Sequence, residues 1–182
     1  MVMFHNSFVK PSLIVLALYF APSFCSERIV QVRDICSKHF LNPKKCAIIL
    51  NSIPGVAKGG EGLVKLSLDV INLANVSALH TINLFNDLIK NASDVYLRQR
   101  YTICSENYDD VLFALTKAKD SVTSGNINDI KFYMSGQALI AEQCRSSAPG
   151  SFELRKNYEY FEVVGFTLEI LANYLAGKYI VI

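Results

Sequence analysis

An unbroken apolar seam in the middle of this 182-residue chain constrains its fold more than any other feature. The seam residues follow one another at steps of four and three in alternation, which is the spacing of side chains between helices of a left-handed bundle. The spacing predicts a helix over residues 94–124, capped by Ser93 and ended by Gly125, that packs against other helices. The seam consists of Leu97, Tyr101, Cys104, Tyr108, Val111, Leu115, Ala118 and Val122.

Helical spacing also occurs before and after this segment. Residues 63–90 carry two overlapping apolar seams, so a helix there is expected to contact two neighbours. A third helix is expected over residues 129–146 with Asn128 as its N-cap, and a fourth begins at about Phe152. No segment shows strand-like alternation over a useful length. Because the connections are short, residues 56–182 are predicted to form an all-α, up-down four-helix bundle.

The first 25 residues have the pattern of a secretory signal peptide. A weakly basic start precedes the mostly apolar residues 12–21, and small residues follow at Ser23 and Cys25, ahead of a cleavage site before Ser26. An apolar stretch of this length is too short to cross a bilayer core of about 30 Å as a helix. A signal peptide over residues 1–25 is therefore favoured over a membrane anchor. A buried helix there would not explain the abrupt start of a charged, polar pattern at Ser26.

A small helical hairpin is predicted for residues 26–55. Ile29, Val32 and Ile35 are spaced along one face of a short amphipathic helix. The pair Asn42-Pro43 then ends that helix and begins another, because Asn is a good N-cap and Pro suits the first helical position.

Four of the five cysteines remain once Cys25 leaves with the signal peptide. An even number in a secreted chain indicates disulfides, and no two cysteines form a Cys-x-x-Cys pair for zinc or redox chemistry. Cys36 and Cys46 can meet across the turn of the hairpin. Cys104 and Cys144 lie at similar heights in an antiparallel pair of helices, counted from the turn between them. We therefore predict the disulfides Cys36–Cys46 and Cys104–Cys144 over the two other pairings.

The sequence carries no recognisable catalytic, metal or cofactor site. His39 and His80 lack a second ligand at metal-binding spacing, so both are interpreted as structural. The pair Asp109-Asp110 is interpreted as part of a solvated helix face, and the glycine and serine motifs of nucleotide-binding proteins and hydrolases are absent. The basic residues are scattered and the net charge is only +2, unlike a nucleic-acid-binding domain. We expect no enzyme activity, cofactor, metal or nucleic-acid partner.

Two sequons offer sites for N-linked glycosylation in a secreted chain, at Asn75 and Asn91. Asn91 falls in the predicted turn between two long helices, where a glycan has room. Asn75 falls in mid-helix, close to an apolar seam. Occupancy is therefore expected to be greater at Asn91.

The segments around the cysteines resemble those of a known family. The similar segments are residues 32–38 (VRDICSK), 42–46 (NPKKC) and 101–110 (YTICSENYDD), and the resemblance to plant invertase/pectin methylesterase inhibitors extends over residues 29–176. It implies a four-helix bundle with an N-terminal hairpin and two disulfides. It also implies a secreted inhibitor, in the extracellular apoplast and cell wall or in the vacuole, that binds a carbohydrate enzyme and covers its active cleft.

Two targets remain open from the sequence. Some invertase inhibitors carry Pro-Lys-Phe just after the glycine that precedes the third bundle helix, whereas Ile127, Asn128 and Asp129 occupy those positions here. The segment Lys156-Asn157-Tyr158 nevertheless looks more like invertase inhibitors of the pollen-allergen type. We favour pectin methylesterase bound at 1:1, with invertase as the alternative. A secreted helical signalling or lipid-binding protein is the alternative from another class.

An inhibitor without catalytic residues must act by occlusion, which needs an interface of about 1,200–2,000 Å² in total. The expected surface combines the polar face of the Cys104 helix with the start of the next helix. Charged and amide groups next to an aromatic ring are compatible with the rim and anchor of an interface. The candidate partner-binding residues are Asn107, Asp110, Asn128, Asp129, Lys131 and Tyr133.

Overall fold

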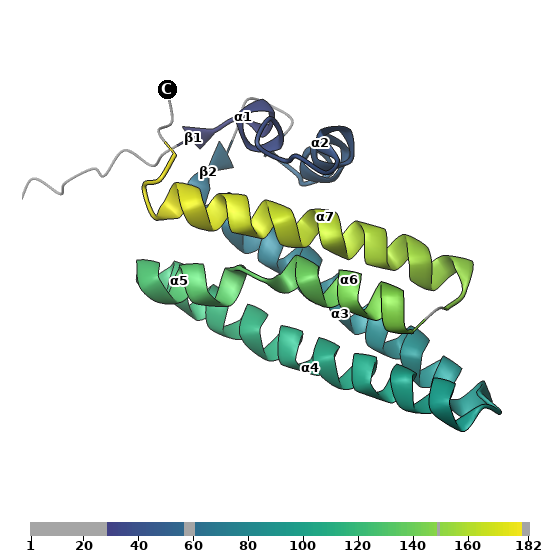
Figure 1. Ribbon diagram of the computed structural model, residues 1–182. Helices are drawn as coiled ribbons and strands as arrows, with labels where there is room; N and C mark the ends of the chain where they lie inside the picture. Colours follow the sequence, from purple (N-terminus) through teal and green to yellow (C-terminus); the bar gives the residue numbers. More distant parts are fainter. Residues whose placement is uncertain (1–28, 57–60, 149, 180–182) are drawn as a thin grey trace, which may run out of the picture.

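The computed structural model describes residues 29–56, 61–148 and 150–179 of the chain (Figure 1). The expected signal peptide lies outside these residues. Seven helices and one short pair of strands occur in the described part. In chain order they are β1 Ile29–Val30, α1 Val32–Cys36, α2 Pro43–Asn51, β2 Glu61–Gly62, α3 Leu63–Asn91, α4 Val95–Ser124, α5 Ile127–Met134, α6 Gln137–Ser147 and α7 Phe152–Leu175.

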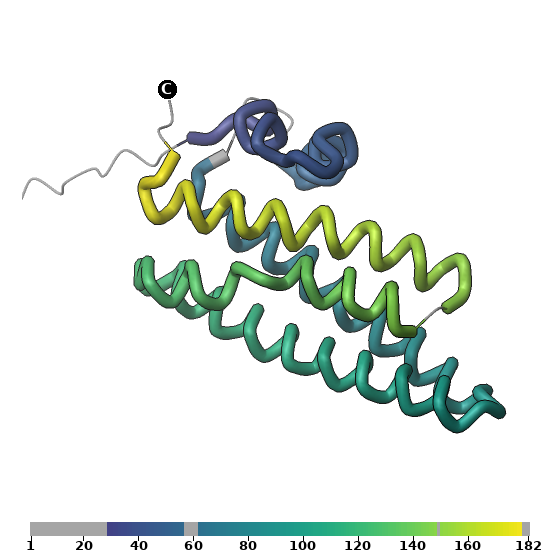
Figure 2. Tube along the Cα trace, in the orientation of Figure 1, coloured from purple at the N-terminus to yellow at the C-terminus, as the bar shows by residue number. Residues whose placement is uncertain are grey.

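The long helices form the predicted up-down bundle. The chain goes up and down through α3, α4, the α5–α6 segment and α7, and α3 packs against both α4 and α7 (Figures 1 and 2). Phe85 on α3 is fully buried and lies within 6.0–6.2 Å, ring to ring, of Tyr101, Tyr108 and Tyr158. Rings of this size at these separations fill the space between three helices and hold them together.

The third bundle helix is not continuous, contrary to the sequence prediction. Ser135 is extended and Gly136 is left-handed (φ 85°), so the helix breaks into α5 and α6. Glycine adopts this conformation without steric cost, which makes it a suitable break point. The Gln137 side chain donates to the Tyr133 carbonyl across the break (2.9 Å) and satisfies one group that the lost helical turn leaves open.

Two predicted helix caps were wrong by one or two residues. Asp94, not Ser93, caps α4, because its side chain accepts from the Leu97 amide at 2.8 Å. Asn126, not Asn128, caps α5 and accepts from the Asp129 amide. Each turn holds two residues that can cap a helix, Ser93 and Asp94 in the first and Asn126 and Asn128 in the second, and only backbone geometry decides between them.

The predicted stop of α4 and start of α2 are confirmed. Gly125 is left-handed (φ 72°) and ends α4, and Asn42 caps α2 through the Lys45 amide at 2.9 Å.

The N-terminal hairpin consists of α1 and α2 and lies on α7 (Figure 1). Ile29 and Val30 form an antiparallel strand pair with Gly62 and Glu61 instead of the first helical turn that their spacing predicted. This pair joins the start of the hairpin to the start of α3. The pairing is set by a contact across some thirty residues, which local periodicity cannot reveal.

Both predicted disulfides are confirmed. Cys36 and Cys46 join α1 to α2 with a Cα–Cα distance of 5.7 Å, and Cys104 and Cys144 join α4 to α6 at 5.8 Å. The second bond fixes how far α6 lies along α4. The prediction that Cys104 and Cys144 lie at the same height, counted in residues from the turn between the helices, was therefore correct.

Candidate target-binding surface

The candidate residues on α4 point away from its buried seam. Asp110 is exposed and Asn107 is half-buried, while Tyr108 between them is fully buried. This alternation follows from the helical period, since residues three apart share a face and the seam residues lie on another. Asn107 is one turn beyond Cys104, so the disulfide to α6 holds this part of α4 in place.

The candidate residues on α5 lie at the end of the bundle where α4 stops. Asn128, Asp129 and Lys131 are exposed, and Tyr133 is half-buried. The Asn126 side chain, besides capping the helix, donates to the Asp129 carboxylate at 2.7 Å, so that carboxylate is already positioned.

Lys131 also has a charged neighbour, Lys178, from the segment that follows α7. The positive charge of the Lys131 side chain repels the Lys178 ammonium and lowers its pKa. Lys178 follows α7, so the last turn of α5 and the end of α7 carry positive charge side by side.

The two groups of candidate residues form a strip and not a cluster. Asp110 lies fourteen residues before the end of α4 at Ser124, which is roughly 21 Å along the axis at 1.5 Å per residue. Helix α5 is only eight residues long, or about 12 Å, so it runs beside the last turns of α4. Asn107 and Asp110 therefore lie beside α6. We call the exposed face of α4 with the adjoining faces of α5 and α6 the α4–α6 strip.

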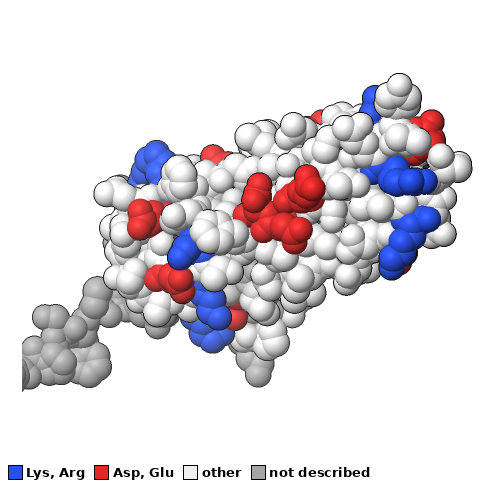
Figure 3. Space-filling model, turned by 90° about the horizontal axis from the view of Figure 1, so that it is seen from below, with Lys and Arg blue, Asp and Glu red and all other residues white. Residues whose placement is uncertain are grey.

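Acidic residues gather in the middle of this strip. Glu106, Asp109 and Asp110 are exposed and lie within four residues of one another on α4. Seen from below, from the α4 side, acidic residues form a group in the centre of the face with basic residues toward both ends (Figure 3). The exposure of Asp109 and Asp110 agrees with their interpretation as part of a solvated helix face. The acidic patch itself was not predicted.

Exposed apolar side chains accompany the acidic group, and sequence reasoning missed them. Apolar positions off the buried seam were the available signal, because such residues have no place in the core. They are Ile103 (48% exposed) and Phe113 (61%) on α4, Phe132 (75%) on α5 and Leu139 (67%) on α6. Phe132 also contacts Tyr133 edge-to-face, with 5.0 Å between ring centroids. Large exposed apolar groups next to charged ones are typical of protein-binding surfaces.

The described residues bring no metal-ligand cluster together, and the cavity between α3 and α4 is partly polar. Within residues 29–56, 61–148 and 150–179, no three His, Cys, Asp or Glu side chains converge as a metal site would require. None of the helices in these ranges has both the length and the apolar character to cross a bilayer. A cavity of about 200 Å³ between α3 and α4 is lined partly by polar residues, Asn72, Asn75, Thr116 and Lys119 among them. This lining does not suit an acyl chain.

The sequence and the fold both match a known family. The family model for plant invertase/pectin methylesterase inhibitors matches residues 30–168, which is more than half of the chain. A protein of Actinidia deliciosa named pectinesterase inhibitor is 36% identical over 120 residues, and the match covers 65% of this chain and 63% of that protein's length. The chain thus matches less than two thirds of this relative.

Solved structures agree at the level of the fold. A crystal structure of a mutant pectin methylesterase inhibitor from Arabidopsis superimposes with a TM-score of 0.68, covering 78% of this chain and 95% of that one at 19% identity. An inhibitor from Arabidopsis thaliana gives 0.60, covering 79% and 95% at 18% identity. The family is one of inhibitors, which agrees with the expectation that the chain is not an enzyme. The bundle, the hairpin and the matched sequence together establish that this chain belongs to the plant invertase/pectin methylesterase inhibitor family.

Proposed function

We propose that this chain inhibits a pectin methylesterase at 1:1 by covering the enzyme's active cleft with the α4–α6 strip. The observation that carries the proposal is the family match over residues 30–168, together with a 36% identical relative that bears the name pectinesterase inhibitor. Invertase is the alternative target, because the matched family includes inhibitors of both enzymes.

The size of the strip suits an occluding interface. Helix α4 has 30 residues and is therefore about 45 Å long, and two adjacent helices present a width of about 20 Å. The resulting face of about 900 Å² compares with roughly 800 Å² per partner in a standard protein–protein interface. One helix pair of this bundle can thus supply the whole contact.

The composition of the strip suggests different tasks for its residues. Phe113 on α4 and Leu139 on α6 are large apolar side chains that face solvent, and would serve as anchors once the enzyme removes them from water. Asn107 and Asp110 lie on α4 within two turns of Phe113, in the middle of the strip, and would make polar contacts to the enzyme. The acidic group would accelerate association with a positively charged target and make it sensitive to salt.

We also propose that the protein acts outside the cell, in the apoplast and cell wall, or in the vacuole. Disulfides are typical of oxidising compartments, and residues 1–25 have the pattern of a signal peptide. Sequencing of secreted material is expected to find Ser26 at or near the N-terminus. An intact Met1 in that material would contradict the proposal.

A titration tests the proposal directly. The mature chain is added to a plant pectin methylesterase and, separately, to an invertase at mildly acidic pH, and residual activity is measured. The expected result is a 1:1 end point with the esterase and little effect on invertase. Inhibition of invertase alone would reverse the choice of target, and binding to neither would favour the signalling alternative.

Two substitutions and a control test the surface. Phe113→Ala and Asp110→Arg are each expected to weaken esterase binding at least ten-fold, about 1.4 kcal/mol. Asp87→Arg, at an exposed carboxylate on α3, reverses a charge away from the strip and should change affinity less than about two-fold. Equal effects of Asp110→Arg and Asp87→Arg would show that net charge, and not the strip, decides binding.

A further inference from the structure

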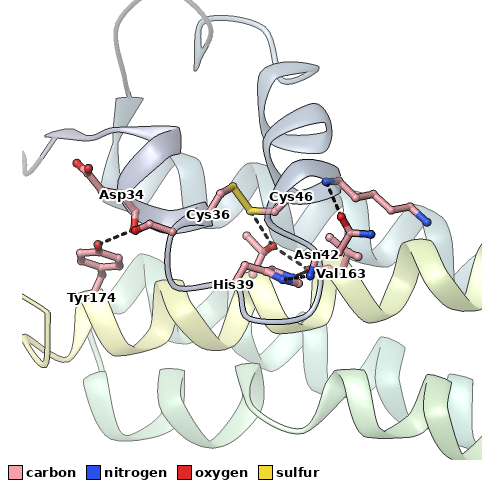
Figure 4. The surroundings of a disulfide bond; sticks show 10 residues. Asp34, Cys36, His39, Asn42, Cys46, Val163 and Tyr174 are labelled. Carbon is pink, nitrogen blue, oxygen red and sulfur yellow. Dashed lines mark hydrogen bonds between the residues drawn. A yellow bond between two sulfur atoms is a disulfide. The ribbon is translucent and has the colours of Figure 1, made fainter.

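We infer that His39 is an acid-sensitive latch that holds the turn of the N-terminal hairpin, residues 37–42, against α7. The side chain is only 2% exposed, and it comes from the segment between α1 and α2. Figure 4 shows its ring between Asn42 of the same turn and Val163 of α7, next to the Cys36–Cys46 disulfide. A histidine buried against a backbone carbonyl 124 residues away ties the hairpin to the bundle.

The hydrogen bonds of the ring determine its protonation state. The backbone N–H of Asn42 donates to His39 Nδ1 at 3.1 Å, so Nδ1 must carry a lone pair and no proton. Nε2 lies 3.2 Å from the Val163 carbonyl oxygen, which can only accept, so Nε2 carries the proton. The latch therefore requires the neutral imidazole with its proton on Nε2.

Protonation destroys this arrangement. A proton added to Nδ1 would face the Asn42 N–H, and two donors would then meet at a separation suited to a hydrogen bond. The ring is buried and lies in edge-to-face contact with Phe166, with 5.8 Å between ring centroids. A positive charge on the ring therefore destabilises the contact between the turn and α7. Histidine side chains in general change charge within the range of about pH 5 to 8.

The charged groups around the latch do not compensate for this effect. Lys38 and Glu169 line the same small cavity as His39, and Lys38 lies over the Tyr179 ring at 4.6 Å. The Lys38 ammonium repels a charged imidazole ring, whereas the Glu169 carboxylate would attract it. To reach that carboxylate, however, the ring must leave Asn42, and this movement itself opens the latch. The other titratable groups between the hairpin and α7 are Asp34, Lys45, Glu159 and Tyr174.

The Cys36–Cys46 disulfide determines which part of the hairpin loosens when His39 is protonated. Cys36 and Cys46 flank residues 37–42, so α1 and α2 remain joined when the turn loses its contact with α7. Asn42 also caps α2 through the Lys45 amide, so the response should extend to the first turn of that helix. We expect acid to loosen a local unit of the hairpin and not to unfold the bundle.

Hydrogen exchange of the mature chain between about pH 7.5 and pH 5 tests the inference. After correction for intrinsic rates, amides of residues 37–42 and 44–46 should open at least ten-fold more at the lower pH, while those in the middle of α4 stay protected. His39→Gln keeps one acceptor and one donor but does not titrate, so its exchange should not depend on pH in this way. His80→Gln removes an exposed histidine from α3 and should behave as the wild type.

Three results would overturn the inference. The first is protection of residues 37–46 that does not change with pH, and the second is an equal loss in the wild type and His39→Gln. The third comes from the nitrogen NMR signals of the wild-type ring, which do not depend on any variant folding. A ring that is charged, or protonated on Nδ1, at neutral pH would contradict the latch.

Discussion

Gly165 lies on α7 where this helix passes close to the start of α6, and its replacement by alanine provides a sharp test of the packing. A Cβ atom at this position would lie 2.7 Å from the backbone nitrogen of Ala138 and 3.0 Å from its Cα. Backbone atoms at such distances cannot give way as the end of a flexible side chain can. The close approach therefore depends on the absence of a side chain at Gly165.

Two effects of the substitution oppose each other. Alanine is about 1 kcal/mol better than glycine in a helix interior, which favours the variant. Overpacking of a tightly packed core costs about 1–3 kcal/mol, and a clash with backbone belongs at the upper end of this range. We expect steric cost to exceed the propensity gain, so that Gly165→Ala loses about 2 kcal/mol of unfolding free energy. In a chain of this size this lowers the Tm by about 4–8 °C.

Urea unfolding of the mature, disulfide-intact chain, followed by far-ultraviolet circular dichroism, measures this loss. Ala138→Gly serves as a second-site test: it removes the neighbouring Cβ but leaves the backbone nitrogen in place, so it should not rescue Gly165→Ala. A Gly165→Ala variant that is more stable than the wild type would refute the reasoning, because helix propensity would then outweigh the contact.

Three further predictions concern the disulfide, the sequons and the buried tyrosines. Replacing both Cys104 and Cys144 by serine should cost roughly 4 kcal/mol, because the bond closes a loop of about 40 residues, and urea unfolding measures it. Glycopeptide analysis of secreted protein should find a greater glycan occupancy at exposed Asn91 than at half-buried Asn75. Greater occupancy at Asn75 would contradict the argument that exposure decides which sequon is glycosylated. Burial raises the pKa of Tyr108 above its usual value near 10, so its contribution to stability is complete below about pH 10 and is lost as the pH rises further. Tyrosinate absorbance and loss of helix should then rise together in an alkaline titration.

The sequence predicted those parts of the fold that depend on local periodicity. The seam of α4 is a property of thirty consecutive residues, and Gly125 marks its end regardless of what packs against it. The Cys104–Cys144 bond followed because counting residues from one short turn fixes relative height in an antiparallel pair.

The features that the sequence did not predict depend on distant partners. The break at Ser135–Gly136 precedes the point where α6 meets Gly165 on α7, a contact that no local pattern contains. The strand pair at Ile29 and the Val163 partner of His39 are likewise contacts between separate segments. The acidic and apolar groups of the strip were not predicted. The sequence indicates that these residues are exposed, but not that residues from α4, α5 and α6 share one face.

The positions of the hairpin and the strip make their two functions separable. The hairpin lies on α7, whereas α4 lies on the other side of the bundle (Figure 1). Acid loosening of residues 37–42 should therefore leave Asp110 and Phe113 in place, and inhibition should not require the latch to be closed. If His39→Gln altered the pH dependence of esterase inhibition as well as hydrogen exchange, the hairpin would have to contact the enzyme. The target-binding surface would then have to extend across α7, and an interface confined to the α4–α6 strip would be wrong.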